Sequence, residues 1–363
     1  MMKIIFTGGG TGGHIFPAIA VADELRKQVT DAEILFVGAK GRIEEKIVPE
    51  NNYKLETINI TGFNRRNYLK NISLPFRFIN ALKLCKNILN EFKPDAVVGT
   101  GGFASASVVY SASKMKIPTL IQEGNAFPGK VTRYMSSKVD KVVISFDETI
   151  KYFKNKNNII KISYPIRNSL SKISKVDALK TLNLNEKNRT LFVFGGSQGA
   201  KAINDVIKNN IEKLFNNNLN IIWQTGKYQF AEINSLCKKY EKNIKVFEFI
   251  HDMKTAYSAC DIVLCRSGIS SIMELSYLKL PCILVPYPLA SDDHQTKNAE
   301  ALLNNNACIL IKQKDIETKL TNKILDTINN NSLLNTISNN IEKFSDPDSA
   351  RKIANEVIKL TLN

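Results

Sequence analysis

The segment that most constrains this chain is residues 7–13, which hold five glycines directly after the short apolar run Lys3–Phe6. Glycine has no Cβ, so the backbone can turn sharply here and come close to a ligand. A helix that follows would direct its free N–H groups into the turn, which suits a phosphate or another anion. We predict a buried strand, a glycine loop, and a helix that begins near Pro17.

His14 stands at the expected junction of this loop and this helix. An imidazole there titrates near neutral pH and can take a proton from a substrate hydroxyl, so His14 is a candidate general base. The alternative is a histidine at a helix terminus whose ring is satisfied by a backbone carbonyl. The loop alone leaves both interpretations open.

The loop also matches G-x-G-x-x-G through Gly8, Gly10 and Gly13, the pattern of a dinucleotide site. Such a site places an acidic residue at the end of the second strand. The second apolar run instead continues into Gly38-Ala39-Lys40, and the nearest acids are Glu44 and Glu45. The sequence contains no G-x-x-x-x-G-K-S/T either, so a nicotinamide cofactor and a P-loop ATPase are both disfavoured.

Size and composition narrow the class of protein further. With 363 residues the chain is long enough for two α/β domains, and its formal net charge of +16 favours an anionic partner. The basic residues are scattered without the motif of a nucleic-acid module, so we expect no nucleic acid. Six cysteines without a C-x-x-C pair suit a reducing cytoplasm, and three dispersed histidines predict no metal site. No apolar run is long enough to span a bilayer.

Short apolar runs alternate with helical patterns along the whole chain, which predicts parallel sheets with right-handed crossovers. The expected strands form two sets: residues 3–6, 33–37, 96–98, 119–121 and 141–145, and then 191–194, 221–224, 245–247, 262–265 and 282–285. We therefore predict an α/β protein with one domain over 1–165 and a second over 166–345.

The last segment, 346–363, is expected to be a helix that packs back on the first domain. Asp346 can cap it and Pro347 suits its first position. Its apolar face would consist of Ala350, Ile353, Ala354, Val357 and Leu360.

Two further strands lead into glycine-rich turns, at Gly99–Phe103 and Gly195–Ala200. Open α/β sheets bind ligands at the carboxyl ends of their strands. Tight βα turns alone would explain one such loop, but explain three poorly. We therefore expect the glycine loops of the two domains to line a ligand site.

The order of these segments resembles the MurG family of glycosyltransferases. The segments that carry the resemblance are Gly8–Pro17, Gln122–Gly129, Gly195–Ala200, Asp261–Glu274, Leu280–Pro281, Val285–Pro286 and Asp292–Ala299. They follow one another in unbroken order from residue 3 to about residue 358. Members of this family transfer GlcNAc from UDP-GlcNAc to lipid I, which makes lipid II for peptidoglycan synthesis.

The resemblance implies a GT-B fold, in which two Rossmann-like domains have parallel sheets that face across a cleft. The first domain would bind the acceptor and the second mainly the nucleotide sugar. The reaction would be an inverting transfer to the 4-hydroxyl of the MurNAc unit, with no cofactor and no metal. The same family likeness implies a role in cell wall biogenesis, cell shape and cell division.

The resemblance also carries over site residues. His14 is the candidate base, and Glu123 is a weaker candidate that could orient or deprotonate the acceptor. Glu274 could accept both hydroxyls of a ribose, while Arg167 and Ser197 could stabilise the departing diphosphate. The positions expected to contact the nucleotide sugar are Thr11, Gly12, Gly13, Asn125, Arg167, Ser197, Ile250, Ile269, Ser270, Ser271, Ile272, Met273, Glu274 and Gln295.

The chain departs from the family's usual residues at several of these motifs. Where members often show H-E-Q-N and G-N-P-V/I-R, the chain keeps the Glu, Asn, Pro and Arg but changes their neighbours. The departures are Phe103, Gln122, Gly124, Ser163, Tyr164 and His294. They bear on the acceptor contacts and leave the residues expected at the donor diphosphate in place.

Membrane contact is expected because the family's acceptor carries a polyprenyl tail. Residues 57–90 contain no acidic residue but several basic ones, interleaved with apolar side chains. This pattern favours peripheral docking on anionic lipid at the cytoplasmic face of the membrane, whereas a solvated basic face beside an ordinary core helix is the plainer alternative. The residues expected to contact lipid are Arg65, Arg66, Lys70, Phe76, Arg77 and Ile79.

Two rival functions remain at this level. A UDP-GlcNAc 2-epimerase shares the two-domain architecture but would not need the acid-free stretch. A non-catalytic nucleotide-sugar binding protein would keep the donor site and transfer nothing.

Overall fold

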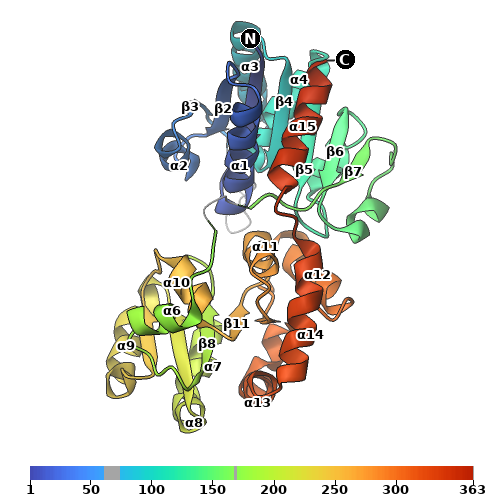
Figure 1. Ribbon diagram of the computed structural model, residues 1–363. Coiled ribbons are helices and arrows are strands. Elements are labelled where there is room, and N and C mark those ends of the chain that lie inside the picture. The colour runs from blue at the N-terminus through green and yellow to red at the C-terminus, as the bar shows by residue number, and fades with distance from the viewer. Residues whose placement is uncertain (61–73, 167–169, 363) are drawn as a thin grey trace. The chain divides into compact units, whose positions relative to one another are not determined.

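The computed structural model describes residues 1–60, 74–166 and 170–362. The chain forms two compact units (Figure 1). The N-terminal unit comprises residues 1–168 together with 346–363, and the C-terminal unit comprises residues 169–345. The C-terminal segment therefore belongs to the unit in which the chain starts.

Within the described residues, the N-terminal unit holds a seven-stranded sheet in the order β3-β2-β1-β4-β5-β6-β7, and its neighbouring strands pair in parallel. Its strands are β1 (Lys3–Gly8), β2 (Glu33–Ala39), β3 (Lys54–Ile58), β4 (Ala96–Gly101), β5 (Thr119–Glu123), β6 (Lys141–Ile144) and β7 (Ile159–Lys161). Its helices are α1 (Gly12–Gln28), α2 (Glu44–Glu50), α3 (Leu74–Phe92), α4 (Phe103–Lys114), α5 (Lys130–Met135), the 3₁₀ helix η2 (Asp147–Tyr152) and α15 (Ser349–Thr361).

Alternate residues of the central strands enter two separate cores. Ile4 and Phe6 of β1 pack in one core with α1 and α15, whereas Ile5 packs in the other with α3 and α4. Parallel strands that are covered on both faces are expected to be apolar throughout, as β1 is. The glycine loops that follow these strands therefore extend from a rigid, doubly covered sheet.

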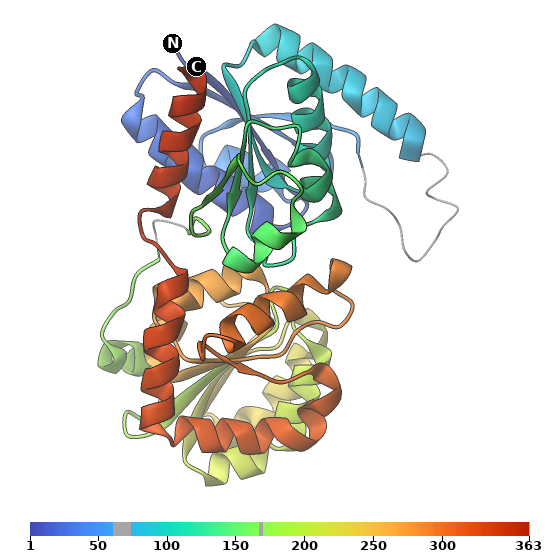
Figure 2. The ribbon, with the colours of Figure 1, turned by 90° about the vertical axis from the view of Figure 1, so that its right-hand side faces the viewer.

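Helix α15 packs along α1, with Ile353, Ala354 and Val357 buried against it (Figures 1 and 2). It begins at Ser349, two residues later than the expected start at Pro347. Asp346 accepts a hydrogen bond from the backbone N–H of Asp348 and so shapes the turn before the helix.

The described part of the C-terminal unit holds a six-stranded parallel sheet in the order β10-β9-β8-β11-β12-β13. Its strands are β8 (Arg189–Phe194), β9 (Leu219–Gln224), β10 (Ile244–Phe247), β11 (Ile262–Cys265), β12 (Cys282–Leu284) and β13 (Ile309–Leu310). Its α-helices are α6 (Lys175–Thr181), α7 (Lys201–Asn209), α8 (Ile211–Asn216), α9 (Lys227–Cys237), α10 (Met253–Ala259), α11 (Ile269–Tyr277), α12 (His294–Leu303), α13 (Ile316–Ile328) and α14 (Asn331–Ile341). Its 3₁₀ helices are η3 (Lys238–Tyr240), η4 (Ser291–Asp293), η5 (Gln313–Asp315) and η6 (Glu342–Phe344).

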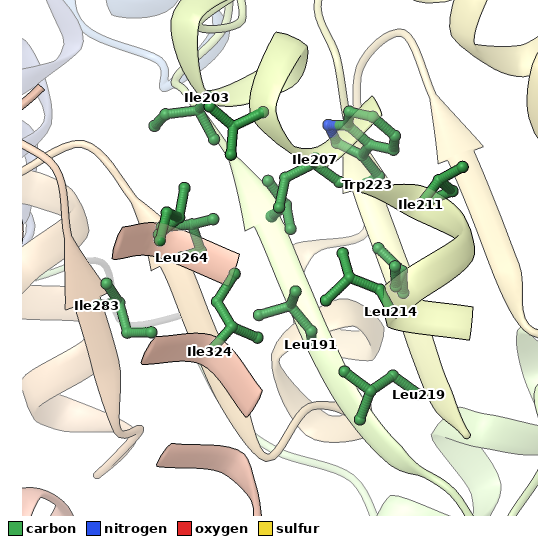
Figure 3. Close-up of a cluster of buried hydrophobic side chains, with 14 of the residues drawn as sticks. Leu191, Ile203, Ile207, Ile211, Leu214, Leu219, Trp223, Leu264, Ile283 and Ile324 are labelled. Carbon is green, nitrogen blue, oxygen red and sulfur yellow. The ribbon is translucent and has the colours of Figure 1, made fainter. Parts of the chain in front are cut away.

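The core of the C-terminal unit lies between this sheet and helices α7, α8 and α13 (Figure 3). Trp223 is buried in it, and its indole N–H donates to Oδ1 of Asn204 at 3.0 Å. Asn204 in turn donates to the carbonyl of Thr225. This buried polar chain fixes the end of β9 against α7, directly beside the third glycine loop.

The expected strands are all present, and the predicted class of two parallel-sheet α/β domains is confirmed. The edge strands β3, β7 and β13 were not expected. In each sheet the strand order reverses between two central strands, β1 and β4 in one and β8 and β11 in the other. Ligands of open α/β sheets bind at such reversal points, and all three glycine loops follow these strands.

Candidate functional site

The first glycine loop ends earlier than the sequence indicated. Helix α1 begins at Gly12, so Gly12, Gly13 and His14 form its first turn, and the expected start near Pro17 is wrong. Thr11 is the N-cap residue in extended conformation. Gly12 and Gly13 can adopt the backbone angles of a helix. Pro17 therefore lies inside α1, where it lacks the N–H that a regular helix would use, and a side chain from elsewhere in the unit supplies the missing hydrogen bond.

That compensation comes from Tyr164. In a regular helix the carbonyl of Gly13 would accept from the N–H of residue 17, which proline lacks. The hydroxyl of Tyr164 donates to the Gly13 carbonyl instead, at 2.7 Å. Tyr164 is buried, with 4% of its surface exposed. Its hydrogen bond therefore holds the chain near residue 164 against the first turn of α1, next to His14.

His14 is held by the second glycine loop. Its Nδ1 lies 2.9 Å from the carbonyl oxygen of Thr100, and the Thr100 hydroxyl donates to the His14 carbonyl at 2.6 Å. The imidazole packs against Gly101, where a Cβ would lie 2.5 Å from Nδ1. Gly101 has a φ of +108°, so a side chain is excluded there by both space and backbone geometry.

The contact with Thr100 defines the tautomer of His14. A carbonyl oxygen only accepts hydrogen bonds, so Nδ1 carries the hydrogen and the lone pair of the neutral ring lies on Nε2. The backbone-satisfied histidine that the sequence offered as an alternative is therefore present. This contact is compatible with a role as base, because it uses Nδ1 whereas a neutral ring of this tautomer takes up a proton at Nε2.

Glu44 is a residue of this region whose position the sequence did not reveal. It is fully buried and accepts from the backbone N–H groups of Gly10 and Ala39, each at 2.9 Å. A Cβ at Gly9 would lie 2.2 Å from its carboxylate. The Glu44 carboxylate therefore supports the backbone of the first glycine loop. It occupies the space that a side chain at Gly9 would need.

Glu123 is engaged by its own loop. Its Oε1 accepts from the backbone N–H and the side-chain amide of Asn125, at 3.0 and 3.1 Å, and its Oε2 accepts from the N–H of Gly129 at 3.0 Å. The side chain is 6% exposed. These contacts shape the turn over residues 123–129, and they give Asn125 a structural partner as well as an expected role toward the donor.

The third glycine loop lies in the C-terminal unit, with Ser197 exposed on it. Gly199 has a φ of +76°, and a Cβ there would lie 1.9 Å from the carbonyl of Thr225. The buried amide of Gln224 donates to the Gly196 carbonyl and accepts from the N–H of Ile250, at 3.0 and 2.8 Å. Gln224, which sequence reasoning missed, therefore ties the expected Ile250 contact to this loop.

Helix α11 begins directly after Gly268, so the segment Ile269–Glu274 starts at the positive end of a helix dipole. Ile269, Ile272 and Met273 are buried in the core, which restricts them to backbone contacts with a ligand. Ser270, Ser271 and Glu274 are partly exposed. Glu274 accepts at Oε2 from the hydroxyl of Tyr257, at 2.8 Å.

Gln295 follows a strained turn at the start of α12. Asp292 and Asp293 both have left-handed backbone conformations, with φ of 52° and 53°. Such angles in two successive non-glycine residues are uncommon and are typical of functional loops. The amide oxygen of Gln295 accepts from the N–H of Tyr287, and its carbonyl accepts from Ser267, so the turn is fixed on both sides.

Some expected residues cannot be placed. Arg167, Arg65, Arg66 and Lys70 lie outside the described residues. Among the departures from the family pattern, Phe103 is 53% exposed at the start of α4, and His294 places Nδ1 2.7 Å from the Ser291 carbonyl. The side-chain amide of Gln122 is buried without a hydrogen-bond partner among the described residues.

Within the described ranges no helix is long and apolar enough to cross a membrane. The same ranges contain no group of three or more His, Cys, Asp or Glu side chains that could hold a metal ion.

The apolar face of α3 is divided between core and solvent. Its later turns bury Ala81, Cys85 and Leu89 in the N-terminal unit. Its first turns expose Phe76 at 70% and Ile79 at 51%. The later turns of α3 are therefore ordinary core, whereas the earlier turns present unburied apolar side chains, and their docking on lipid stays a prediction.

Comparison with known proteins defines the class. Residues 4–144 match the glycosyltransferase family 28 N-terminal domain, and residues 190–353 match the glycosyltransferase family 28 C-terminal domain. The solved structure of Acinetobacter baumannii MurG superposes with a TM-score of 0.80 and 26% identity, covering 99% of this chain and 100% of that one. The UDP complex of Staphylococcus aureus MnaA superposes with a TM-score of 0.70 at 14% identity, covering 100% and 97%, which shows the fold alone. The protein is a family 28 glycosyltransferase of GT-B type.

Curated relatives narrow the class. A protein of Phocaeicola vulgatus is 40% identical over 99% of this chain and 96% of its own length. One of Thermoanaerobacter sp. is 37% identical over 99% and 100%. Both are named UDP-N-acetylglucosamine–N-acetylmuramyl-(pentapeptide) pyrophosphoryl-undecaprenol N-acetylglucosamine transferase. The chain belongs to this family, the MurG family, as the resemblance predicted.

Proposed function

We propose that the protein transfers GlcNAc from UDP-GlcNAc to the 4-hydroxyl of the MurNAc unit of lipid I, with inversion, and so forms lipid II for peptidoglycan synthesis. The observation that carries this proposal is His14, held in a defined tautomer between two glycine loops at the strand reversal of the N-terminal unit. Support for the substrates comes from the relatives, which share nearly the full length of the chain and carry this activity in their names.

In the proposed reaction His14 acts on the acceptor. Its Nε2 takes the proton of the 4-hydroxyl as that oxygen attacks C1 of GlcNAc. The bond between C1 and the diphosphate oxygen breaks, and UDP leaves with the electron pair. Attack from the face opposite the leaving group inverts the configuration at C1. The Thr100 carbonyl keeps Nδ1 as a donor and stabilises the imidazolium that forms.

The C-terminal unit would bind the donor. Glu274 accepts the ribose hydroxyls, and the first N–H groups of α11 and the exposed Ser197 donate to the diphosphate. The positive end of a helix dipole stabilises negative charge on a leaving group. Arg167 is proposed as a further cation at the diphosphate on the strength of its motif alone.

Glu123 takes the second place among the candidate bases. Both of its oxygens accept hydrogen bonds from Asn125 or Gly129. A carboxylate that must lose these contacts to take a proton is a poor base. We propose that Glu123 instead holds the 123–129 turn in shape for the acceptor or donor.

We propose that the protein docks peripherally on the cytoplasmic face of the membrane through the first turns of α3. Phe76 and Ile79 expose apolar surface there, and Arg77 adds an exposed positive charge beside them. Apolar side chains with basic neighbours bind anionic lipid surfaces. Arg65, Arg66 and Lys70 are proposed as further contacts from the sequence alone.

The experiment that tests the function measures UDP release from UDP-GlcNAc with and without a lipid I analogue. We expect release that depends on the acceptor, with a disaccharide-linked lipid as the second product. Conversion of UDP-GlcNAc to its C2 epimer without acceptor, and without net release of UDP, would instead indicate the epimerase. UDP-GlcNAc binding with neither release, transfer nor epimerisation would indicate a passive binder.

A further inference from the structure

Tyr257, on α10, is fully buried among aromatic rings. Its ring makes edge-on contacts with Phe192 and Phe194 of β8, with centroids 5.5 and 6.2 Å apart. Both neighbours are themselves buried in the sheet, so the ring is held within a close-packed core. The Tyr257 hydroxyl is therefore held in one position by the packing of its ring against β8.

That fixed hydroxyl meets Glu274. It donates to Oε2 at 2.8 Å, from an element that lies before β11 in the chain to one that lies after it. Burial, and next the Glu274 carboxylate, raise the pKa of Tyr257 far above its ordinary value, so the hydroxyl keeps its proton and remains a donor. Hydrogen bonds to ionised groups are among the strong ones in proteins.

The contact with Tyr257 restrains the side chain of Glu274. Glu274 is only partly buried, and a glutamate has three rotatable bonds whose freedom must be lost when it binds a ligand. One carboxylate oxygen held by Tyr257 fixes the plane of the group in advance. A carboxylate offers about four acceptor positions, so one hydrogen bond from the tyrosine still permits others to a ligand.

We propose that Tyr257 is a positioning residue for ribose recognition. It orients the Glu274 carboxylate toward the 2′- and 3′-hydroxyls and thereby sets the preference of the donor site for a ribonucleotide over a 2′-deoxyribonucleotide. The inference rests on the proposed role of Glu274 at the ribose. A site built to hydrogen-bond a hydroxyl discriminates strongly against an analogue that lacks it, and this discrimination depends on a preorganised acceptor.

The test compares the binding of UDP and of 2′-deoxy-UDP by calorimetry. We expect Tyr257→Phe to lower the ratio of the two affinities by about fivefold to tenfold, mainly through weaker UDP binding, since a charge-assisted contact is lost. In a Glu274→Gln background the same substitution should change the ratio no further. The control is Tyr240→Phe, which removes the hydroxyl of another buried tyrosine, one that donates to a glutamate, Glu212, at 3.3 Å. It should leave the ratio unchanged.

A second variant covers the case in which the phenylalanine protein does not fold. Tyr257→para-aminophenylalanine keeps the ring and a donor, so it should retain most of the preference for UDP. Loss of the preference in this variant overturns the inference. So does an unchanged ratio in Tyr257→Phe, or an equal loss of both affinities.

Failure of the proposed function has a different signature. If the wild-type protein does not bind UDP, or binds both nucleotides equally, Glu274 has no role at the ribose and the inference falls with it. If wild type prefers UDP and Glu274→Gln abolishes this preference while Tyr257→Phe does not, only the positioning role is overturned.

Discussion

His14 and Thr100 exchange two hydrogen bonds, one through the imidazole and one through the backbone. Nδ1 of His14 meets the Thr100 carbonyl at 2.9 Å, and the Thr100 hydroxyl donates to the His14 carbonyl at 2.6 Å. The first and second glycine loops are thereby joined at the residue proposed as base. The ring can neither turn over nor shift without breaking a contact, so Nε2 is held in one direction.

We expect His14→Ala to lower kcat by about 10²–10⁴-fold, the range typical of a lost general base. UDP-GlcNAc binding should change little, because most of the residues proposed to bind the donor lie in the C-terminal unit and the proposed base acts on the acceptor. In wild type kcat/KM should fall at acidic pH as the imidazole becomes protonated, and this limb should disappear in the variant. Steady-state kinetics across pH provide the measurement. His14→Gln is the control, and near-normal turnover in it would end the base assignment.

Glu123→Gln should destabilise the protein more than it slows the chemistry. Its amide nitrogen would face the N–H donors of Asn125 or Gly129, and each hydrogen bond lost to a buried carboxylate costs about 1.5–3 kcal/mol. Thermal unfolding should show a lower Tm, while the acidic limb of the kinetic profile persists. A variant with wild-type Tm and a 10²-fold lower kcat would instead make Glu123 the base.

Glu44→Gln should disturb the first glycine loop. The glutamine amide cannot accept from both Gly10 and Ala39, so one buried N–H loses its partner at a cost of about 1–3 kcal/mol. We expect a lower Tm together with a lower kcat, since the loop leads directly into His14. Glu45→Gln is the matched control, because Glu45 accepts from the Gly41 N–H in an exposed position. Equal effects of the two substitutions would contradict the supporting role of Glu44.

Tyr164→Phe should cost about 1 kcal/mol by leaving the Gly13 carbonyl without its donor, or about 2–4 °C in the Tm of a unit of this size. Pro17→Ala restores an N–H at position 17, which can donate to the same carbonyl within α1. The loss should therefore be much smaller when Tyr164→Phe is made in the Pro17→Ala protein. Additive effects in this double-mutant cycle would show that the tyrosine and the missing N–H are not linked.

The course of the chain was largely predictable from its sequence, because doubly covered parallel strands are continuous apolar runs. The edge strands were not predicted because they lack such continuous apolar runs. Strand β3, Lys54–Ile58, alternates polar and apolar residues, and β13 is only two residues long. The start of α1 was misplaced because proline is common at the first helical position. Its tolerance within the helix depends on Tyr164, about 150 residues away in the chain.

The site residues were predictable only as far as local motifs reach. The glycine loops and His14 lie in short continuous segments, so their sequence was enough to predict that they lie close together at the end of a strand. Glu44, Gln224 and Tyr257 act through contacts between elements that the sheet topology brings together, and no spacing in the sequence announces them. Their common feature is a buried polar group that supports a loop or a side chain at the carboxyl end of a strand.

Substitution of Phe76 and Ile79 by serine should weaken binding to anionic vesicles. Full insertion of one such side chain contributes about 1.5–3 kcal/mol, so the double variant should bind at least tenfold more weakly. Stability should hardly change, because both side chains are mostly exposed in the folded protein. The matched control replaces Tyr228 and Leu289 by serine. These two side chains belong to the C-terminal unit and are 86% and 74% exposed. Vesicle sedimentation measures the binding, and transfer to a short-chain, water-soluble lipid I analogue should remain at the wild-type rate. Equal weakening by both pairs would mean that apolar surface binds lipid without regard to its place on α3.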